Sequence, residues 1–172
     1  MPEEKAYLLD ANVFIEAKRR YYAFDLCPGF WECLIWHHEG NHRILSIDKV
    51  KNELDRGGDE LKDWADAAPV SCFASTNESS VISEYGRIMN WVQAQAQYKP
   101  AAKREFAQGA DGWLIAHAKV HGLTLVTHEA LAPEACSTLP MPNVCEVFAV
   151  SYVDTFDMLR DLETSFTWEP SA

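Results

Sequence analysis

Four acidic residues lie beside short hydrophobic segments in distant parts of the chain. They are Asp10, Glu53, Asp111 and Glu129. Carboxylates at the ends of separate elements can converge on one point of a fold, and several carboxylates together bind a hard divalent cation such as Mg²⁺ or Mn²⁺. A cation held in this way activates water and neutralises charge on a phosphate. The pattern therefore indicates metal-assisted phosphoryl chemistry.

The segments around these acids predict alternating strands and helices. The expected strands are residues 6–9, 43–47, 70–73 and 123–127, with a weak one at 144–150. The expected helices are residues 12–20, 28–38, 49–56 with Asp48 as N-cap, 59–67, 78–98, 111–121 and 154–162. Strands that are apolar throughout and alternate with helices predict an α/β fold. We expect one domain over residues 1–172, with a parallel sheet of about four to five strands sandwiched by helices.

In such sheets, ligands bind beyond the carboxyl ends of the strands. Asp10 and Glu129 both lie just past an expected strand end, so they should share one edge of the sheet. Asp111 lies in the first turn of its helix, where the helix dipole favours a carboxylate. We expect these acids to be metal ligands together with Glu53.

Two neutral residues are candidates to support the carboxylates. Asn12 lies two residues after Asp10, and Thr127 ends an expected strand. Asn12 is expected to act as a neutral metal ligand or as a hydrogen-bond donor to a phosphate or a metal-bound water. Thr127 is expected to contact the carboxylates that bind the metal without binding the metal itself.

Each acidic position also has a simpler structural explanation. The segment Asp10-Ala11-Asn12 and the residue Asp111 would serve as ordinary helix N-caps. Glu53 would be a surface helix residue, since Glu is rarely buried unpaired. Glu129 would be an exposed loop acid, with Glu134 as a competitor for its role. The order, spacing and element context of the acids together favour the metal site.

The composition is that of a folded protein from a reducing compartment. Of the 172 residues, 48% are hydrophobic and 24% are charged, which is close to the globular average. The chain has no apolar run of membrane-spanning length, and residues 1–5 lack the pattern of a secretory signal. Five unevenly spaced cysteines indicate free thiols. These features predict a cytoplasmic protein without a membrane segment.

The net charge of −11 argues against broad electrostatic binding of nucleic acid. The basic residues, however, are concentrated near the candidate ligands in sequence. They are Lys18, Arg19, Arg20, Lys49, Lys51, Arg56, Lys99, Lys103 and Arg104. The end of the chain is acidic, and residues 151–172 are expected to form an acidic helix and tail. Solvated faces without any partner explain these charges equally well.

Residues 21–42 are expected to form an aromatic helical insertion. We expect its aromatic side chains to make core or dimer contacts, and stacking on nucleobases is the alternative. Two other groups contain residue types that can bind a metal. His117 and His121 have helical spacing but no evident third ligand. Cys27, Cys33 and the nearby histidines lack the usual zinc-finger spacing.

Four segments together resemble a PIN domain, in the pattern of bacterial and archaeal VapC-type toxins. They are Tyr7–Ile15, Val50–Glu53, Ala110–Ala118 and Leu125–Glu129. The resemblance covers about residues 5–150, and the aromatic insertion is similar to that of a branch of PIN-like proteins. It implies a Mg²⁺- or Mn²⁺-dependent endoribonuclease that cleaves RNA, the toxin of a type II toxin–antitoxin pair, often neutralised by an antitoxin protein. It also makes a homodimer plausible.

The resemblance identifies Asp10, Glu53 and Asp111 with the best-defined acidic positions of the family. Two departures concern the remaining site. His128-Glu129 stands where many members have Asn-Asp, so Glu129 is a provisional fourth ligand. Gly112 follows Asp111 and lowers helix propensity there.

Two other functions are alternatives to the ribonuclease. A catalytically inactive PIN-fold binding or regulatory module is favoured by the acidic surface and by the departure at Glu129. A phosphatase of the haloacid dehalogenase type fits poorly, because it requires Asp where Asn12 stands and Thr where Phe14 stands.

Overall fold

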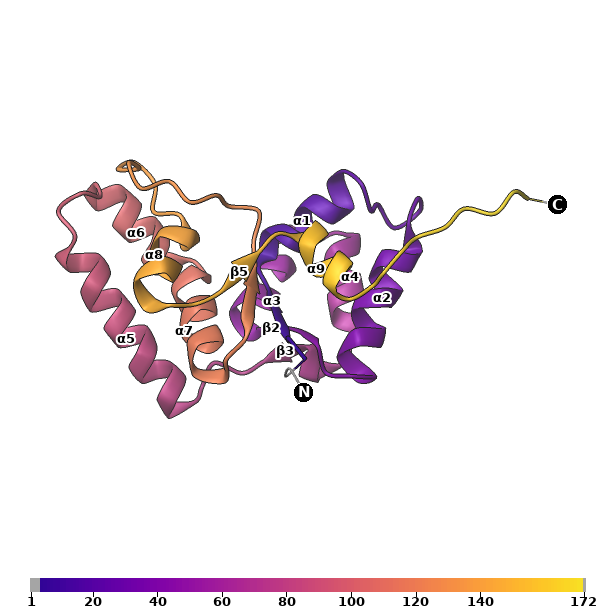
Figure 1. Cartoon of the computed structure of the whole chain (residues 1–172), viewed down its shortest axis with the longest axis horizontal. Coiled ribbons are helices and arrows are strands. Elements are labelled where there is room, and N and C mark those ends of the chain that lie inside the picture. Colours follow the sequence, from indigo (N-terminus) through magenta and orange to yellow (C-terminus); the bar gives the residue numbers. More distant parts are fainter. Residues whose placement is uncertain (1–3, 172) are drawn as a thin grey trace.

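The computed structural model of the protein describes residues 4–171 (Figure 1). The expectations for residues 1–3 and 172, including the absence of a secretory pattern, fall outside the described part. A five-stranded sheet has the order β3-β2-β1-β4-β5, and all its neighbouring strands are parallel. The strands are β1 (Tyr7–Leu9), β2 (Ile44–Ile47), β3 (Phe73–Ala74), β4 (Thr124–Val126) and β5 (Tyr152–Val153). This sheet confirms the predicted α/β fold and its number of strands.

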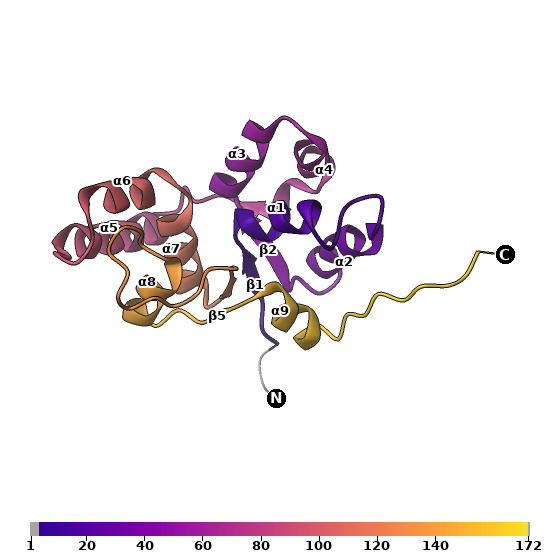
Figure 2. The same cartoon turned by 90° about the horizontal axis from the view of Figure 1, so that it is seen from above.

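Helices connect the strands and cover the sheet. They are α1 (Ala11–Arg19), α2 (Pro28–Glu39), α3 (Asp48–Gly57), α4 (Glu60–Ala67), α5 (Ser79–Ala94), α6 (Pro100–Gln108), α7 (Asp111–His121), α8 (Met141–Phe148) and α9 (Thr155–Asp161). Figures 1 and 2 show α5 to α8 on one side of the sheet and α1, α2, α4 and α9 on the other. The helices therefore form two layers with the sheet between them, as the sequence predicts.

The register of the two central strands sets up the carboxyl edge of the sheet. Leu9 of β1 lies opposite Val126 of β4, and both are fully buried. The N–H of Asp10 donates a hydrogen bond of 3.1 Å to the carbonyl of Val126. The two strands thus end at the same level, and the residues that follow them emerge side by side.

Helix ends are set by local chemistry that the sequence displays. Gly58 and Gly122 follow α3 and α7 with φ of 59° and 65°, a left-handed conformation that glycine adopts without a Cβ penalty. Asp59 and Asp154 cap α4 and α9 by accepting hydrogen bonds from the N–H groups of Leu61 and Asp157. These signals account for the accuracy of the predicted boundaries of α4, α7 and α9.

The region between β2 and β4 differs from the prediction in three places. Val70–Cys72 is a 3-10 turn instead of a strand, because Pro69 starts a turn in which Cys72 N–H donates to the Pro69 carbonyl at 2.9 Å. Helix α5 ends at Ala94, before the predicted residue 98, since Gln95 takes an extended conformation. The prediction missed α6, which begins at Pro100, a residue suited to the first helical position.

The weak strand predicted at residues 144–150 was wrong, because most of that segment belongs to helix α8. Pro142 lies in its first turn, and Val144 and Phe148 are four residues apart, a spacing that places both on one helix face. The fifth strand follows at Tyr152–Val153.

Asp48 is not the N-cap of α3, as the sequence had suggested. Ile47 occupies the cap position, and Asp48 is the first helical residue. Its carboxylate instead accepts hydrogen bonds from the N–H and hydroxyl of Thr76, at 3.1 and 2.9 Å. Asp48 therefore fastens the segment between β3 and α5 to the start of α3.

Aromatic residues around α2 pack together in a cluster centred on Phe30 and Trp31. Phe30 and Trp31 are 0% and 3% exposed. Tyr22 stacks on Phe30 with ring centroids 4.5 Å apart, and Phe24 stacks on Trp31 at 4.1 Å. We call these four residues, with Phe166 from the C-terminal segment, the aromatic cluster. The expected core contact is therefore present for Phe30 and Trp31, whereas Tyr21 and Trp36 are 69% and 63% exposed.

All five cysteines are free, as predicted. Among residues 4–171, no helix has the length and apolar character needed to cross a membrane.

Candidate active site

Asp10 and Glu129 are linked through Thr127 at the carboxyl edge of the sheet. Asp10 directly follows β1 and is only 4% exposed. The Thr127 hydroxyl donates to Oδ2 of Asp10 at 3.3 Å, and the N–H of Glu129 donates to the Thr127 hydroxyl oxygen at 3.2 Å. The parallel register of β1 and β4 makes this link, so Thr127 supports Asp10 from the neighbouring strand.

Glu53 and Asp111 meet where α3 approaches the start of α7. Oε1 of Glu53 accepts a hydrogen bond of 3.0 Å from the N–H of Ala110, the residue before Asp111. Glu53 thereby uses one of the N–H groups that a helix start leaves without an internal partner. Within residues 4–171, the Asp111 carboxylate makes no hydrogen bond of its own, and Ala110 rather than Asp111 holds the N-cap position.

Electrostatics show that these acids share one environment. Burial, followed by the charges of Glu129 and Glu53, raises the pKa of Asp10 from 3.8 to about 7. Burial and then the charges of Asp10, Glu129 and Glu53 raise the pKa of Asp111 from 3.8 to about 8. We call Asp10, Glu53, Asp111 and Glu129 the acidic site. Its buried carboxylates are costly to ionise together, and a bound dication would remove that cost.

A cavity of about 320 Å³ opens beside Asp111 and Glu129, between α6, α7 and the loop before α8. Burial raises the pKa of Glu129, and the N–H of Met141 opposes this by donating to its Oε2 at 2.6 Å. The site thus combines buried acids with an adjoining space that a ligand can enter.

Glu105 also lines this cavity, and the sequence analysis missed it. Its charge contributes to the raised pKa of both Asp111 and Glu129. The signal that could have found it is the helix start at Pro100, followed by Ala102 and Phe106, which are buried and four residues apart. An α6 recognised from that pattern would have brought Glu105 toward the start of α7.

Asn12 stands apart from the other predicted residues. It is exposed in the first turn of α1, and its side chain makes no hydrogen bond to the acidic site among the described residues. N-capping does not explain Asp10 either, since Asp10 holds the cap position of α1 without forming a side-chain cap hydrogen bond there. Helix N-capping therefore does not explain the presence of an aspartate at position 10 or at position 111.

The acidic site fits a hard dication in the type of its ligands. Carboxylate oxygens are the donors that Mg²⁺ and Mn²⁺ prefer, and Asp10 and Asp111 carry a desolvation cost that such an ion relieves. Within residues 4–171, however, no three His, Cys, Asp or Glu side chains lie close enough together to form a metal-holding group. Glu53 and Glu129 each direct one carboxylate oxygen to a backbone N–H. The four acidic residues lie in the same region, but their side chains are not arranged as a group of ligands around one cation.

The other two groups weighed as metal sites are not assembled. The rings of His117 and His121 are 4.4 Å apart, and Nε2 of His121 lies 2.9 Å from Glu78, but the described residues provide no three-ligand group there. In the second group, His38 bonds to the Ile44 carbonyl and to Ser71. Sγ of Cys33 lies 3.6 Å from the Thr164 hydroxyl. In the first group, Nδ1 of the buried His117 has no hydrogen-bond partner among the described residues.

Gly112, the unexpected residue after Asp111, has a packing role. A Cβ at this position would lie 2.9 Å from Cε2 of Tyr85 and 3.3 Å from Cε1 of Phe106. Tyr85 stacks on Trp113 with centroids 3.9 Å apart, and Nζ of Lys49 lies 5.1 Å from the centre of the Trp113 ring. The glycine lets α5 and α6 approach the first turn of α7, which positions Asp111.

Comparison with known proteins finds no match among curated proteins. A family model described as a domain of unknown function, DUF4411, matches residues 7–166, so the chain belongs to that family.

Proposed function

We propose that this DUF4411 protein is a divalent-metal-dependent endoribonuclease of the PIN type. One observation carries the proposal: Asp10, which is 4% exposed just past β1, and the half-buried Asp111, in the first turn of α7, both have a raised pKa because of burial and because of the charges of neighbouring acids, which include Glu53 and Glu129. A fold rarely keeps such a cluster without a cation or a proton to neutralise it.

The acidic site would hold Mg²⁺ or Mn²⁺ through Asp10, Glu53, Asp111 and Glu129. When bound, the cation supplies an activated water and neutralises charge on the scissile phosphate. Thr127 orients Asp10 through its hydroxyl, and Glu53 fixes the start of α7 through the Ala110 N–H. Glu105 adds negative charge at the cavity mouth, which raises the local attraction for a dication.

The resemblance to PIN domains extends the proposal to the biology of the protein. We propose that the protein is a cytoplasmic toxin that cleaves RNA, is neutralised by an antitoxin protein and forms a homodimer. A gene for a small antitoxin-like protein beside the gene for this chain would support that role. Loss of toxicity on co-expression of that neighbour tests it.

A catalytically inactive PIN-fold binding module is the second candidate. The observation in its favour is that the described residues form no three-ligand metal group. Such a module would keep the acids for another purpose, and its thermal stability would not respond to Mn²⁺.

The deciding experiment is cleavage of total cellular RNA by the purified protein with and without Mn²⁺. We expect metal-dependent fragments from the wild type and at least a roughly 100-fold lower rate for Asp111→Asn. Asp157→Asn is the matched control, because Asp157 is exposed on α9 and its side chain pairs with Arg160. Wild-type cleavage by Asp111→Asn would contradict the proposal. A folded wild type that neither cleaves RNA nor responds to Mn²⁺ would favour the binding module.

A further inference from the structure

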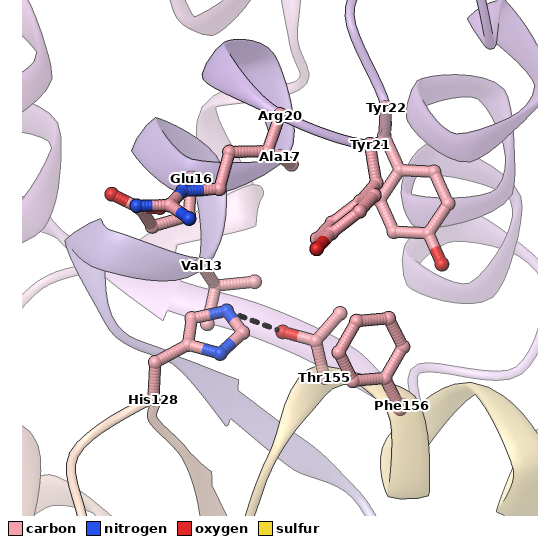
Figure 3. A pocket seen from close by; sticks show the side chains of 9 residues that line it. All are labelled: Val13, Glu16, Ala17, Arg20, Tyr21, Tyr22, His128, Thr155 and Phe156. Atoms are coloured by element: carbon pink, nitrogen blue, oxygen red, sulfur yellow. Dashed lines mark hydrogen bonds and ion pairs between the residues drawn. The ribbon is translucent and has the colours of Figure 1, made fainter.

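A second cavity, of about 250 Å³, opens on the other side of the segment that follows β4 (Figure 3). It is bounded by α1 and the turn after it, by His128 and by the first turn of α9. Val13 and Ala17 of α1 supply apolar walls, and Tyr21 and Phe156 contribute aromatic rings. We call this cavity the aromatic pocket.

The aromatic pocket adjoins the acidic site along the chain and in space. His128 lines it, and His128 lies between Thr127, which bonds to Asp10, and Glu129. Val13, on the opposite wall, donates its N–H to the Asp10 carbonyl at 3.1 Å. While His128 lines the aromatic pocket, the next residue, Glu129, lines the cavity beside Asp111. The acidic site therefore lies between the aromatic pocket and the cavity beside Asp111.

The rings of the pocket are unusually open to solvent. Tyr21 is 69% exposed and Phe156 is 39% exposed. Their centroids are 6.2 Å apart with the planes inclined by 67°, so each ring leaves area for another flat group. Aromatic rings at the surface of such a pocket are suited to stacking with nucleobases. In the aromatic cluster, by contrast, the rings of Phe30 and Trp31 are 0% and 3% exposed, and Tyr22, which stacks on Phe30, also lines the pocket.

Polar groups at the rim complement a nucleotide. Nε of Arg20 pairs with Glu16 at 2.5 Å, and the Arg20 side chain remains 66% exposed; its terminal guanidinium nitrogens suit a phosphate. Arg19, which precedes it on α1, is also exposed but does not line the pocket. His128 bonds through Nε2 to the Thr155 hydroxyl at 3.0 Å, which fixes its ring in the wall (Figure 3). Beside the Glu16 carboxylate, which also lines the pocket, Arg20 thus offers guanidinium nitrogens to a phosphate, and the Tyr21 hydroxyl and His128 offer hydrogen-bonding groups to a base edge.

We propose that the aromatic pocket binds a nucleobase of single-stranded RNA, close to the phosphate held at the acidic site. The inference rests on the proposed function and adds a substrate feature: an unpaired base next to the cleavage point. Duplex RNA would keep that base stacked and out of the pocket. The pocket therefore selects single-stranded RNA and gives cleavage a sequence context.

The test measures binding without cleavage, in EDTA. Fluorescence anisotropy compares a labelled ten-nucleotide single-stranded RNA of mixed sequence with an abasic chain of the same length. For the double variant Tyr21→Ala/Phe156→Ala, we expect affinity for the RNA to fall about tenfold or more and affinity for the abasic chain to stay the same. Trp36→Ala is the control, because Trp36 is 63% exposed on α2 and does not line this pocket. Circular dichroism verifies that all variants are folded.

An unchanged RNA affinity in the double variant would overturn the inference, as would an equal loss for both probes. Sedimentation adds a second readout. A wild-type dimer that is lost in the double variant, with RNA affinity unchanged, would also overturn it and assign the pocket to self-association. Because binding is measured without metal, the two proposals can fail separately. If only the ribonuclease proposal is wrong, the wild type will still bind RNA in a base-dependent way, but Mn²⁺ will not cause it to cleave RNA.

Discussion

The aromatic cluster and the acidic site each contain buried side chains, Phe30 and Trp31 in the first and Asp10 in the second, but the two regions contribute to the free energy of folding with opposite signs. In the cluster, rings such as those of Phe30 and Tyr22 stack and leave water, which stabilises the fold. In the acidic site, Asp10 and Asp111 lose hydration and repel each other. The rings of the aromatic cluster stabilise the fold, whereas the fold positions the carboxylates of the acidic site for a ligand at a cost in stability. Substitutions in the two regions should therefore change stability in opposite directions.

The largest effect is expected in the aromatic cluster. Phe30→Ala removes a fully buried ring that stacks on Tyr22, so we expect it to destabilise the protein by about 3–5 kcal/mol. Urea unfolding measures this. The increase in stability caused by Mn²⁺ should persist in conditions where the variant is still folded. A loss of less than about 1 kcal/mol would show that the cluster is not part of the core.

Asp10→Asn should have the opposite effect on the metal-free protein. Folding raises the pKa of Asp10 from 3.8 to about 7, so the folded state binds protons more tightly than the unfolded state. The wild type should therefore lose stability as pH rises from about 4 to about 8. The uncharged amide removes that loss, and we expect a gain on the order of 2 kcal/mol at pH 8. Urea unfolding across this pH range, in EDTA, measures it. A destabilised variant at pH 8 would contradict this account of the site.

Gly112→Ala tests the packing that positions Asp111. The new methyl group would meet the Tyr85 ring at 2.9 Å, so we expect a loss of about 1–2 kcal/mol despite the better helix propensity of alanine. Gly86→Ala, in α5, is the matched control because a Cβ there meets no atom within 4 Å; it should stabilise by roughly 0.5–1 kcal/mol. Equal effects from the two substitutions, measured by thermal unfolding, would exclude the packing role.

Thr127→Val should have the smallest effect on stability. It keeps the shape of the side chain and removes the hydroxyl that donates to Asp10 and accepts from Glu129 N–H. We expect a loss of about 1 kcal/mol in unfolding free energy and a roughly tenfold weaker Mn²⁺ affinity. Thr155→Val, which removes a similarly buried hydroxyl bonded to His128, should leave Mn²⁺ affinity unchanged. Equal metal affinities of the wild type and Thr127→Val would exclude the supporting role of Thr127.

The sequence predicted most of the sheet because β1 and β4 are short apolar runs with an acid or a threonine at the end. It misassigned Val144–Val150 because apolar residues in a short segment fit a strand and a buried helix equally well. The prolines before and within α8 were the better signal. The prediction also missed helix α6, because only two of its residues, Ala102 and Phe106, are buried, and two buried residues give a weak apolar pattern.

From the sequence we could predict which strands and helices carry the residues of the acidic site, but not how those elements contact one another. The order of the strands places Asp10 beside Thr127, and parallel strand ends suffice for that. The hydrogen bond from Ala110 N–H to Glu53 depends on how α3 meets α7, which is a tertiary contact without a local sequence signal. The same holds for the aromatic pocket, whose walls come from α1, α9 and His128.

The most direct test of the central claim is calorimetric titration of the metal-free protein with Mn²⁺ at pH 7, in two buffers of different ionisation enthalpy. If the acidic site binds the cation, the wild type should bind Mn²⁺ and release protons from the Asp10–Asp111 pair, whose pKa values lie at about 7 and 8. Asp10→Asn should lose that binding, and Asp157→Asn should keep it. A wild type that does not bind Mn²⁺, or an Asp10→Asn variant that binds it as tightly as the wild type, would contradict the account.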